Sequence, residues 1–318
     1  MSTTRFVAAI SLVGLMGPGA GVVYSQDYPS KTIRIVTSVP GGGSDFTARQ
    51  VVQALSPLGQ PVVVDNRVSV TVGEVGAKGA PDGYTLTVQG ASLWIGPLLQ
   101  KFPYEIERDF APISLISREA FILTVHPSMP VKSVQELLAL AKARPGEISF
   151  ANSSPGSPAF LGIELLKTMT GIKLLTVPYK STVAAVTGVL SGESQLTIGD
   201  IALVAPHTKS GKLRALAVTS LDASALAPGL PPISAAGLPG YEMTGATGFW
   251  SIIKTPAPII TKLNQEVVRY LNRPEVKERF LNYQVEVVAS SPEEFGARIR
   301  GDIAKWGKIF KEAGIKFE

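Results

Sequence analysis

A run of glycines follows the first predicted strand of the chain and has the composition of an anion-binding loop. Residues 32–39 are apolar, as in a buried strand, and the loop after them consists of Pro40, Gly41, Gly42, Gly43, Ser44 and Asp45. Three consecutive glycines let the backbone aim successive N–H groups at one point, and a helix predicted to start near Phe46 adds its positive end. The loop can therefore hold an anion in a backbone nest. A plain tight turn would use the same residues, so this motif alone leaves both interpretations open.

A serine-rich loop repeats this arrangement in the middle of the chain. It lies between strand-like residues 149–152 and a helix predicted over residues 158–170, and it contains Ser153, Ser154, Gly156 and Ser157. Helix capping explains one of these serines, but three serines and a glycine exceed what a cap requires. Two such loops could hold the two sides of one carboxylate. Each N–H bond to a charged oxygen contributes about 1.5–3 kcal/mol, so a few of them suffice for micromolar binding.

Three further polar residues near predicted strand ends are secondary candidates. Ser92 follows the strand predicted over residues 84–88, and we expect it to line a cleft. Asp200 follows the strand predicted over residues 196–198 and is expected either to orient the polar end of a ligand or to cap a helix. Asp45 is interpreted as a helix N-cap that holds the glycine loop in shape.

The chain lacks the residue types on which much catalysis and metal binding depend. It contains no cysteine and only two histidines, which excludes disulfides, thiolate metal sites, cysteine nucleophiles and a three-histidine zinc site. His126 is interpreted as a surface-turn residue, and His207 lies in a predicted helix that ends at Gly211. A serine hydrolase needs a positioned base, and the sequence has no Gly-x-Ser-x-Gly elbow. We therefore predict a binding protein without covalent chemistry and without a cofactor.

The first 25 residues have the layout of a secretory signal peptide. Arg5 precedes the apolar residues 6–16, a Gly-Pro-Gly sequence follows, and Val23 and Ser25 occupy suitable −3 and −1 positions for cleavage. The alternative is a membrane anchor, but this apolar run is about half the length that a spanning helix of 20 residues needs. We predict export to the periplasm with residues 1–25 removed.

The charge of the mature chain gives no sign of a nucleic-acid partner. Removal of residues 1–25 takes away one arginine, which leaves 29 basic and 25 acidic residues and a net charge of +4. The basic residues are scattered rather than concentrated in a patch, so we predict no nucleic-acid-binding surface. A mild positive charge is compatible with an anionic solute.

Short apolar runs alternate with helical patterns along most of the chain, which is typical of an α/β fold built from βαβ units. Two similar lobes joined by crossing strands explain the pattern. Lobe 1 is predicted to comprise residues 26–124 and 222–318, and lobe 2 residues 125–221. A last helix opens with a capping box and carries an apolar stripe, which we assign to the core rather than to a ligand site: Phe295, Ile299, Ile303, Trp306 and Phe310.

An ordered set of motifs resembles one protein family. Residues 28–36, the loop 40–45 and Arg49 are similar to the opening of the substrate-binding receptors of tripartite tricarboxylate transporters, also called Bug proteins. The match covers residues 28–315 in the expected order, and no single motif decides it. Its other hallmarks are residues 81–86 (PDGYTL), 109–112 (DFAP), 177–180 (VPYK) and 210–219 (SGKLRALAVT).

The resemblance implies a two-lobed periplasmic-binding-protein fold of type II, a "Venus flytrap" in which each lobe is a mainly parallel sheet flanked by helices. It implies that the protein closes on its solute and delivers it to membrane permease subunits, and we expect it to act as a monomer. It also implies that the two loops hold a ligand carboxylate, partly through bridging waters, which carries over to residues 40–45 and 153–157. A periplasmic sensor that passes its bound state to a signalling partner would have the same fold and is the alternative function.

Two departures from the family pattern bear on the ligand. A Pro-Gly-Ala-Gly-Gly-like stretch is usual after Asn66-Arg67, where this chain has the shorter, apolar residues 68–73. A histidine is common after the second loop, where this chain has Phe160 before Leu161. Both changes replace polar or flexible elements with apolar ones. We expect a cleft suited to an aromatic or apolar-bodied acid rather than to highly charged di- and tricarboxylates, with a neutral ligand as the alternative.

Overall fold

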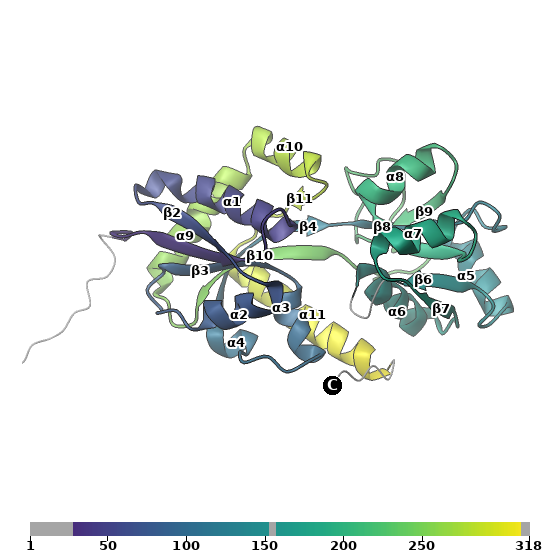
Figure 1. Cartoon of the computed structure of the whole chain (residues 1–318), viewed down its shortest axis with the longest axis horizontal. Coiled ribbons are helices and arrows are strands. Elements are labelled where there is room, and N and C mark those ends of the chain that lie inside the picture. Colours follow the sequence, from purple (N-terminus) through teal and green to yellow (C-terminus); the bar gives the residue numbers. More distant parts are fainter. Residues whose placement is uncertain (1–27, 153–156, 313–318) are drawn as a thin grey trace, which may run out of the picture.

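The computed structural model describes residues 28–152 and 157–312, apart from the side chains of residues 69 and 70. The predicted signal peptide lies outside the described residues, as do Ser153, Ser154 and Gly156 of the second loop. Two lobes lie side by side and are joined by extended strands (Figure 1).

The sheet of lobe 1 has six strands in the order β11–β4–β10–β3–β1–β2. Strand β1 pairs in parallel with β2 and β3, whereas β10 and β4 are antiparallel to their neighbours. The strands are β1 Ile33–Thr37, β2 Val62–Asn66, β3 Thr85–Gly90, β4 Phe110–Glu119, β10 Gly245–Ile252 and β11 Glu286–Val287.

The sheet of lobe 2 has five strands in the order β7–β6–β8–β5–β9. They are β5 Phe121–Val125, β6 Ser149–Asn152, β7 Leu175–Pro178, β8 Leu196–Asp200 and β9 Arg214–Val218. Strands β7, β6 and β8 are parallel, and β5 runs antiparallel to β8 and β9. The expected α/β fold of two lobes is confirmed, but each sheet is mixed rather than mainly parallel, because the strands that carry the chain between the lobes run against the βα units.

The chain crosses between the two sheets twice. Only Ala120 separates β4 from β5, so the first crossing is a single residue. The return lies between β9 and β10, over residues 219–244. Within it the Tyr241 hydroxyl donates to the carbonyl of Gly162 at 2.9 Å, which ties this segment to lobe 2. The predicted lobe boundaries at residues 124/125 and 221/222 stay predictions.

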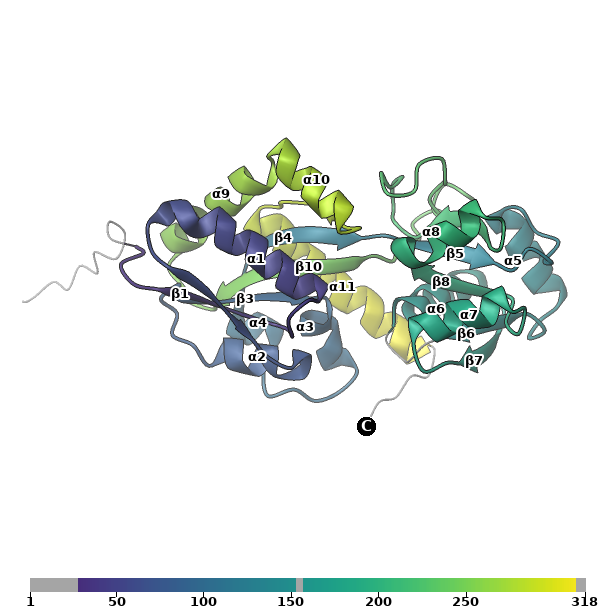
Figure 2. The same cartoon turned by 45° about the horizontal axis from the view of Figure 1, so that its top comes forward.

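Helices cover both faces of each sheet (Figures 1 and 2). In lobe 1, α1, α9 and α10 cover one face and α2, α3, α4 and α11 the other; in lobe 2, α5 and α6 cover one face and α7 and α8 the other. Their bounds are α1 Gly43–Leu55, α2 Ser69–Ala77, α3 Ser92–Ile95, α4 Ile106–Asp109, α5 Val134–Ala143, α6 Pro158–Thr170, α7 Thr182–Leu190, α8 Ile201–Lys209, α9 Ala257–Leu271, α10 Pro274–Asn282 and α11 Pro292–Glu312.

The start of α11 follows from its local sequence. The Ser291 hydroxyl accepts a hydrogen bond from the N–H of Glu294 at 3.1 Å, and the Glu294 carboxylate accepts one from the N–H of Ser291 at 2.8 Å. This reciprocal pair is the predicted capping box, and it satisfies two backbone donors that the helix itself leaves free.

One hydrophobic cluster runs through both lobes. It includes Trp94 of lobe 1, Phe121 at the first crossing, Leu166 of lobe 2 and the buried side of α11. The predicted core stripe of α11 is confirmed, because Phe295, Ile299, Trp306 and Phe310 are all at most 4% exposed and Ile303 packs against them. Separate clusters lie under α1, α9 and α10 and under α7 and α8.

Candidate functional site

In each lobe, two neighbouring strands of the sheet are followed by helices that pack on opposite faces of that sheet. In lobe 1, β1 leads to α1 and β3 to α3, and these helices lie on opposite faces of the sheet. In lobe 2 the same holds for β6 and β8 with α6 and α8. The loops after such a pair of strands diverge and leave a crevice beyond the carboxyl ends of the strands, which is where α/β proteins bind ligands. The predicted residues that the structure describes lie at the ends of these four strands or in the segments that follow them.

The glycine loop after β1 is held in a fixed shape. Gly41 has φ of +86°, a conformation that favours glycine, and its N–H donates to the Asp45 carboxylate at 3.0 Å. The carbonyl of Gly41 accepts a hydrogen bond from the Tyr283 hydroxyl at 3.0 Å, and the Tyr283 ring stacks on Phe46 with centroids 4.0 Å apart. The backbone of the loop is therefore positioned from both sides.

Helix α1 begins at Gly43 with Gly42 as its N-cap, three residues earlier than predicted. Asp45 is therefore not the N-cap but lies in the first turn, where its negative charge complements the helix dipole. The first N–H groups of a helix have no partner within it, and Pro40, Gly41 and Gly43 are exposed while Ser44 is half-buried. The loop thus presents backbone donors at an accessible surface.

The carboxylate of Asp45 supports the loop instead of facing a ligand. It is 4% exposed and also accepts hydrogen bonds from Asn66 Nδ2 at 2.8 Å and Arg49 Nε at 3.0 Å. Burial alone would raise the pKa of Asp45, but the hydrogen bonds from Arg49, Asn66 and the Gly41 N–H outweigh it and hold the pKa below its usual value.

In the second loop, Ser157 serves as the N-cap of α6. Its hydroxyl accepts from the Phe160 N–H at 3.2 Å and donates to Asn152 Oδ1 at 3.1 Å. Capping therefore accounts for this one serine, as the sequence suggested. The Phe160 side chain is half-buried and belongs to none of the three hydrophobic clusters; its neighbour Leu161 packs against the shared cluster.

The loop after β3 lies against the glycine loop. The Ser44 hydroxyl oxygen is 3.8 Å from the position that a Cβ on Gly90 would occupy, so these two segments touch. Ser92 is the exposed first residue of α3, two residues further along. Ser44 therefore neighbours the end of β3, two residues before Ser92 in the chain.

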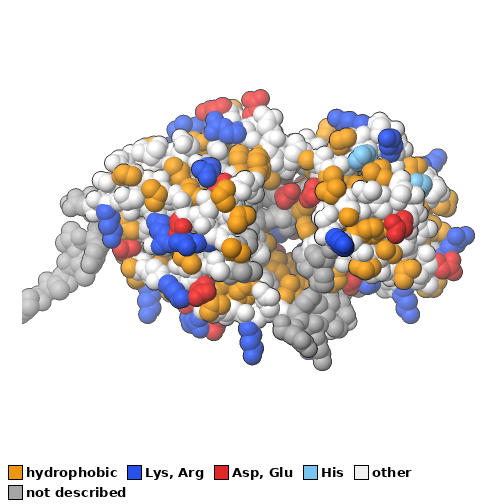
Figure 3. All heavy atoms as spheres, in the orientation of Figure 1, with side chains coloured by type: hydrophobic (Ala, Val, Ile, Leu, Met, Phe, Trp, Pro, Cys, Tyr) orange, Lys and Arg blue, Asp and Glu red, His pale blue; other side chains and the backbone are white. Residues whose placement is uncertain are grey.

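Two acidic side chains lie where the lobes meet. Asp200 ends β8 and is the N-cap residue of α8, but its side chain makes no capping hydrogen bond, and burial raises its pKa. Glu119, which the sequence did not single out, ends β4; burial and the nearby charge of Asp200 raise its pKa to about 7. Figure 3 shows acidic side chains at the hollow between the lobes.

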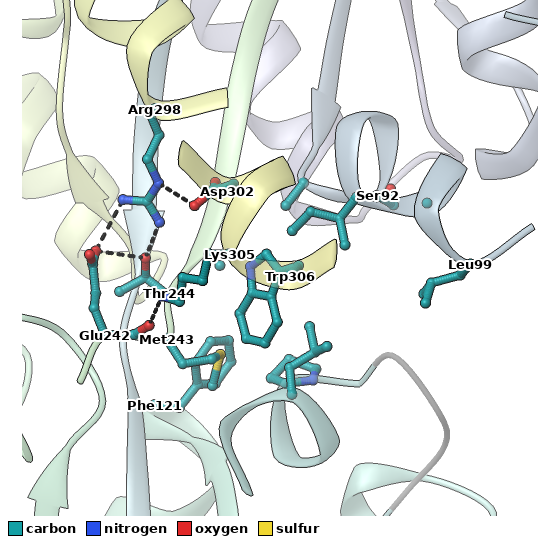
Figure 4. Close-up of a pocket in the computed structure, with 16 residues that line it drawn as sticks. Ser92, Leu99, Phe121, Glu242, Met243, Thr244, Arg298, Asp302, Lys305 and Trp306 are labelled. Atoms are coloured by element: carbon teal, nitrogen blue, oxygen red, sulfur yellow. Dashed lines mark hydrogen bonds and ion pairs between the residues drawn. The ribbon is translucent and has the colours of Figure 1, made fainter. Parts of the chain in front are cut away.

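A pocket of about 190 Å³ lies beside α11, between the two lobes (Figure 4). Lobe 1 contributes Ser92 and its neighbours, and lobe 2 contributes Phe121 of β5 and the start of α6. The end of the return segment, the first residue of β10 and α11 form the rest of the wall. The lining residues are Ala91, Ser92, Ile95, Gly96, Leu99, Phe121, Pro158, Leu161, Glu242, Met243, Thr244, Gly245, Arg298, Asp302, Lys305 and Trp306.

The charged residues of this pocket neutralise one another. Arg298 donates to Asp302 Oδ1 at 2.9 Å and to Glu242 Oε1 at 3.0 Å, and Trp94 Nε1 donates to Asp302 Oδ2 at 3.1 Å. The Lys305 ammonium donates to the backbone carbonyl of Glu242. These contacts join α11 to the segment in which the chain returns to lobe 1.

Sequence reasoning assigned Trp306 to the core alone. The side chain is 4% exposed and also forms part of the pocket wall, so it has both roles. A sequence signal was available, because Arg298, Asp302 and Trp306 are spaced four residues apart and therefore share one side of a helix. The polar members of this row mark the side of α11 on which the pocket lies.

Two searches of the described residues bear on other classes of function. Across residues 28–152 and 157–312, no helix is both long and apolar enough to cross a bilayer. In the same ranges, no three His, Asp or Glu side chains are grouped so as to hold a metal ion.

Comparison with known proteins confirms the resemblance found in the motifs. The model of the "Tripartite tricarboxylate transporter family receptor" matches residues 47–315. The protein BugT of Bordetella pertussis is 33% identical over 327 residues, which span all of both chains. The solved structure described as R. palustris Rpa4515 with adipate has 32% identity and a TM-score of 0.71, and periplasmic binding protein BugD has 29% and 0.67; each match covers 92% of this chain and 100% of the other. The chain belongs to the receptor family of tripartite tricarboxylate transporters.

Proposed function

We propose that the chain is an extracytoplasmic receptor that captures a small carboxylated molecule between its lobes and delivers it to a membrane permease. The observation that supports this most directly is the position of the exposed glycine loop between β1 and α1, together with the start of α6 just beyond the carboxyl end of β6. Membership of a transporter receptor family supports the same conclusion, as does a relative whose structure was solved with adipate.

The glycine loop is suited to hold a carboxylate without altering it. Its backbone donors lie at the positive end of α1, and Asp45 and Tyr283 keep the loop in one conformation before a ligand arrives. A preorganised site loses less conformational freedom on binding, which favours affinity. The loop after β6, with Ser157 and the start of α6, would contact the ligand from lobe 2.

The location and partners of the receptor follow from the same proposal. Residues 1–25 direct export to the periplasm and are removed, and the mature chain acts as a monomer that docks on permease subunits. No step in this cycle requires covalent chemistry or a cofactor. The ligand is an organic acid whose body is apolar or aromatic, in keeping with Phe160 and Leu161 after the second loop.

A thermal-shift titration of the mature protein tests the proposal. Monocarboxylates, dicarboxylates, aromatic acids and neutral amides are added separately, and a ligand that binds only the folded state raises the melting temperature as its concentration increases. We expect at least one carboxylate to do so, while its amide does not. The proposal is wrong if no carboxylate shifts the melting temperature or if the amides act as strongly as the acids.

A further inference from the structure

The pocket beside α11 adjoins the glycine loop and the start of α6. Ala91 and Ser92 in its wall follow Gly90, which lies against the glycine loop at Ser44. On the opposite side, Pro158 is the first residue of α6 and directly follows the cap residue Ser157. A ligand whose carboxylate is held between the glycine loop and the start of α6 can therefore extend into this pocket.

The walls of the pocket are mainly apolar. Trp306, Phe121 and Met243 lie on one side in the close-up view, with Leu99 and Ser92 across from them (Figure 4). Ile95, Pro158 and Leu161 complete the apolar lining. Such a surface favours a group that is itself apolar, because its burial removes apolar area from water.

The charged groups at the edge of the pocket are already engaged. The guanidinium of Arg298 forms ion pairs with two carboxylates, those of Glu242 and Asp302. The N–H groups that would bind a second ligand carboxylate are therefore already used. Among the described lining residues Lys305 forms no ion pair within 4 Å, but its ammonium donates to a backbone carbonyl, and burial lowers its pKa. The pocket is thus poorly equipped for a doubly charged ligand.

The volume of the pocket limits the size of the ligand body that it can hold. Its volume of about 190 Å³ is slightly larger than an engineered apolar cavity of about 150 Å³ that binds benzene. One six-membered ring or a branched chain of similar bulk would fill it. A larger ring system would not fit without rearrangement of α11.

We propose that this pocket is the subsite for the ligand's body, and that the receptor selects monocarboxylic acids with one compact aromatic, alicyclic or branched apolar body. The inference rests on the proposed function, since it presupposes that a carboxylate is held between the glycine loop and the start of α6. Leu161 and Ser92, one from each lobe, are the specificity-determining residues that can be changed with least disturbance, because Leu161 is half-buried and Ser92 is exposed.

Calorimetric titration of the mature protein with acetate, benzoate, cyclohexanecarboxylate and adipate tests the inference. We expect the two ring-bearing acids to bind at least about tenfold more tightly than acetate and adipate, because only they fill the apolar subsite. In Leu161→Asn, a polar group in the wall reduces the affinity for the ring-bearing acids about tenfold. In Ser92→Phe, a bulky side chain occupies the subsite and has the same effect.

Leu175→Asn is the matched control, because Leu175 lies on β7, is 55% exposed and does not line the pocket. It should bind every acid as the unmodified protein does. The inference is overturned if the ring-bearing acids keep full affinity in folded Ser92→Phe and Leu161→Asn, or if adipate binds the unmodified protein as tightly as they do. Binding of none of the acids to the unmodified protein would overturn the proposed function itself, and this inference with it.

Discussion

The carboxylate of Asp45 accepts a hydrogen bond from the backbone N–H of Gly41 at 3.0 Å. The bond closes the turn in which Gly41 adopts φ of +86°. Because Asp45 belongs to the first turn of α1, the shape of the loop is tied to the start of the helix. The donors of the loop are therefore set in place by the fold rather than by the ligand.

Replacing Asp45 with Asn should weaken both the fold and ligand binding. The amide cannot accept from Gly41, Asn66 and Arg49 as the carboxylate does, so we expect a loss of about 1–3 kcal/mol in the free energy of unfolding at pH 7 and a lower affinity for organic acids. Urea denaturation and calorimetry measure the two effects.

The contribution of Asp45 to stability should also depend on pH. The folded-state pKa of Asp45 is lowered, so the stability that it contributes is present above about pH 4 and is lost as the pH falls through the folded-state value. Asp222→Asn, at an exposed position, should show neither effect, and equal stability of both variants at pH 7 would contradict this role of Asp45.

Replacing Gly42 with Val should abolish binding while the fold stays intact. Gly42 has φ of −83°, which a β-branched residue adopts, and an added Cβ would meet only the Val39 carbonyl at 3.7 Å. The side chain would nevertheless cover the backbone donors of the loop. We expect an unchanged melting temperature and an affinity reduced at least about tenfold, measured by calorimetry. Gly301→Val on α11, where an added Cβ meets no neighbour within 4 Å, serves as the control; unchanged affinity in Gly42→Val would remove this loop from the site.

Binding of an organic anion should weaken as the pH rises through 7. Glu119 has a pKa raised to about 7 by burial and by the charge of Asp200, so it gains a negative charge beside the cleft in this range. Affinity measured from pH 6 to pH 8 should fall in the unmodified protein and stay flatter in Glu119→Gln. The exposed Glu193→Gln should behave like the unmodified protein, and an equal pH dependence in all three proteins would exclude Glu119 as the cause.

The same residue should lower the stability of the fold at neutral pH. An acid whose folded-state pKa lies above its unfolded value binds more protons in the folded state, so stability decreases as the pH rises from about 4.5 to about 7. Glu119→Gln should therefore be more stable than the unmodified protein at pH 8, by up to about 3 kcal/mol. Urea denaturation at pH 5 and pH 8 checks the sign, and a variant that is less stable at pH 8 would refute it.

Loss of Arg298 should destabilise the protein through the carboxylates that it leaves behind. Asp302 is 5% exposed, and in Arg298→Ala it keeps only the hydrogen bond from Trp94 among the described contacts. Removing one partner of a buried pair is costly, and we expect a loss of about 2–4 kcal/mol, measured by urea denaturation. Arg300→Ala removes an exposed arginine from the same helix and should cost less than about 0.5 kcal/mol. Similar losses in the two variants would show that the ionic contacts contribute little.

Local sequence patterns predicted the features that depend only on residues a few positions apart in the chain. The capping box of α11, the glycine loop and the serine cap of α6 all appear where the sequence placed them. Strand β4 was not predicted, and Pro112 within it would ordinarily exclude an interior strand. The structure accommodates Pro112 because the pairing with β10 shifts register there and β11 pairs only with residues 117–118.

Contacts between distant segments could not be predicted in this way. Helix α2 contains several β-branched residues, and its position depends on glycines: a Cβ on Gly73 would lie 2.3 Å from the Tyr104 ring. The apolar stripe of α11 indicated a buried face but not that this face contacts both lobes. The raised pKa of Glu119 results from burial and from the charge of Asp200, 81 residues later in the chain. No local sequence pattern predicts that these two residues lie close together in the fold.

Helix α11 lies at the end of the chain, yet its buried side completes the interior of both lobes. Neither lobe can therefore complete its packing until this helix is in place. For the same reason heat should disrupt the two halves together, in one cooperative transition rather than two.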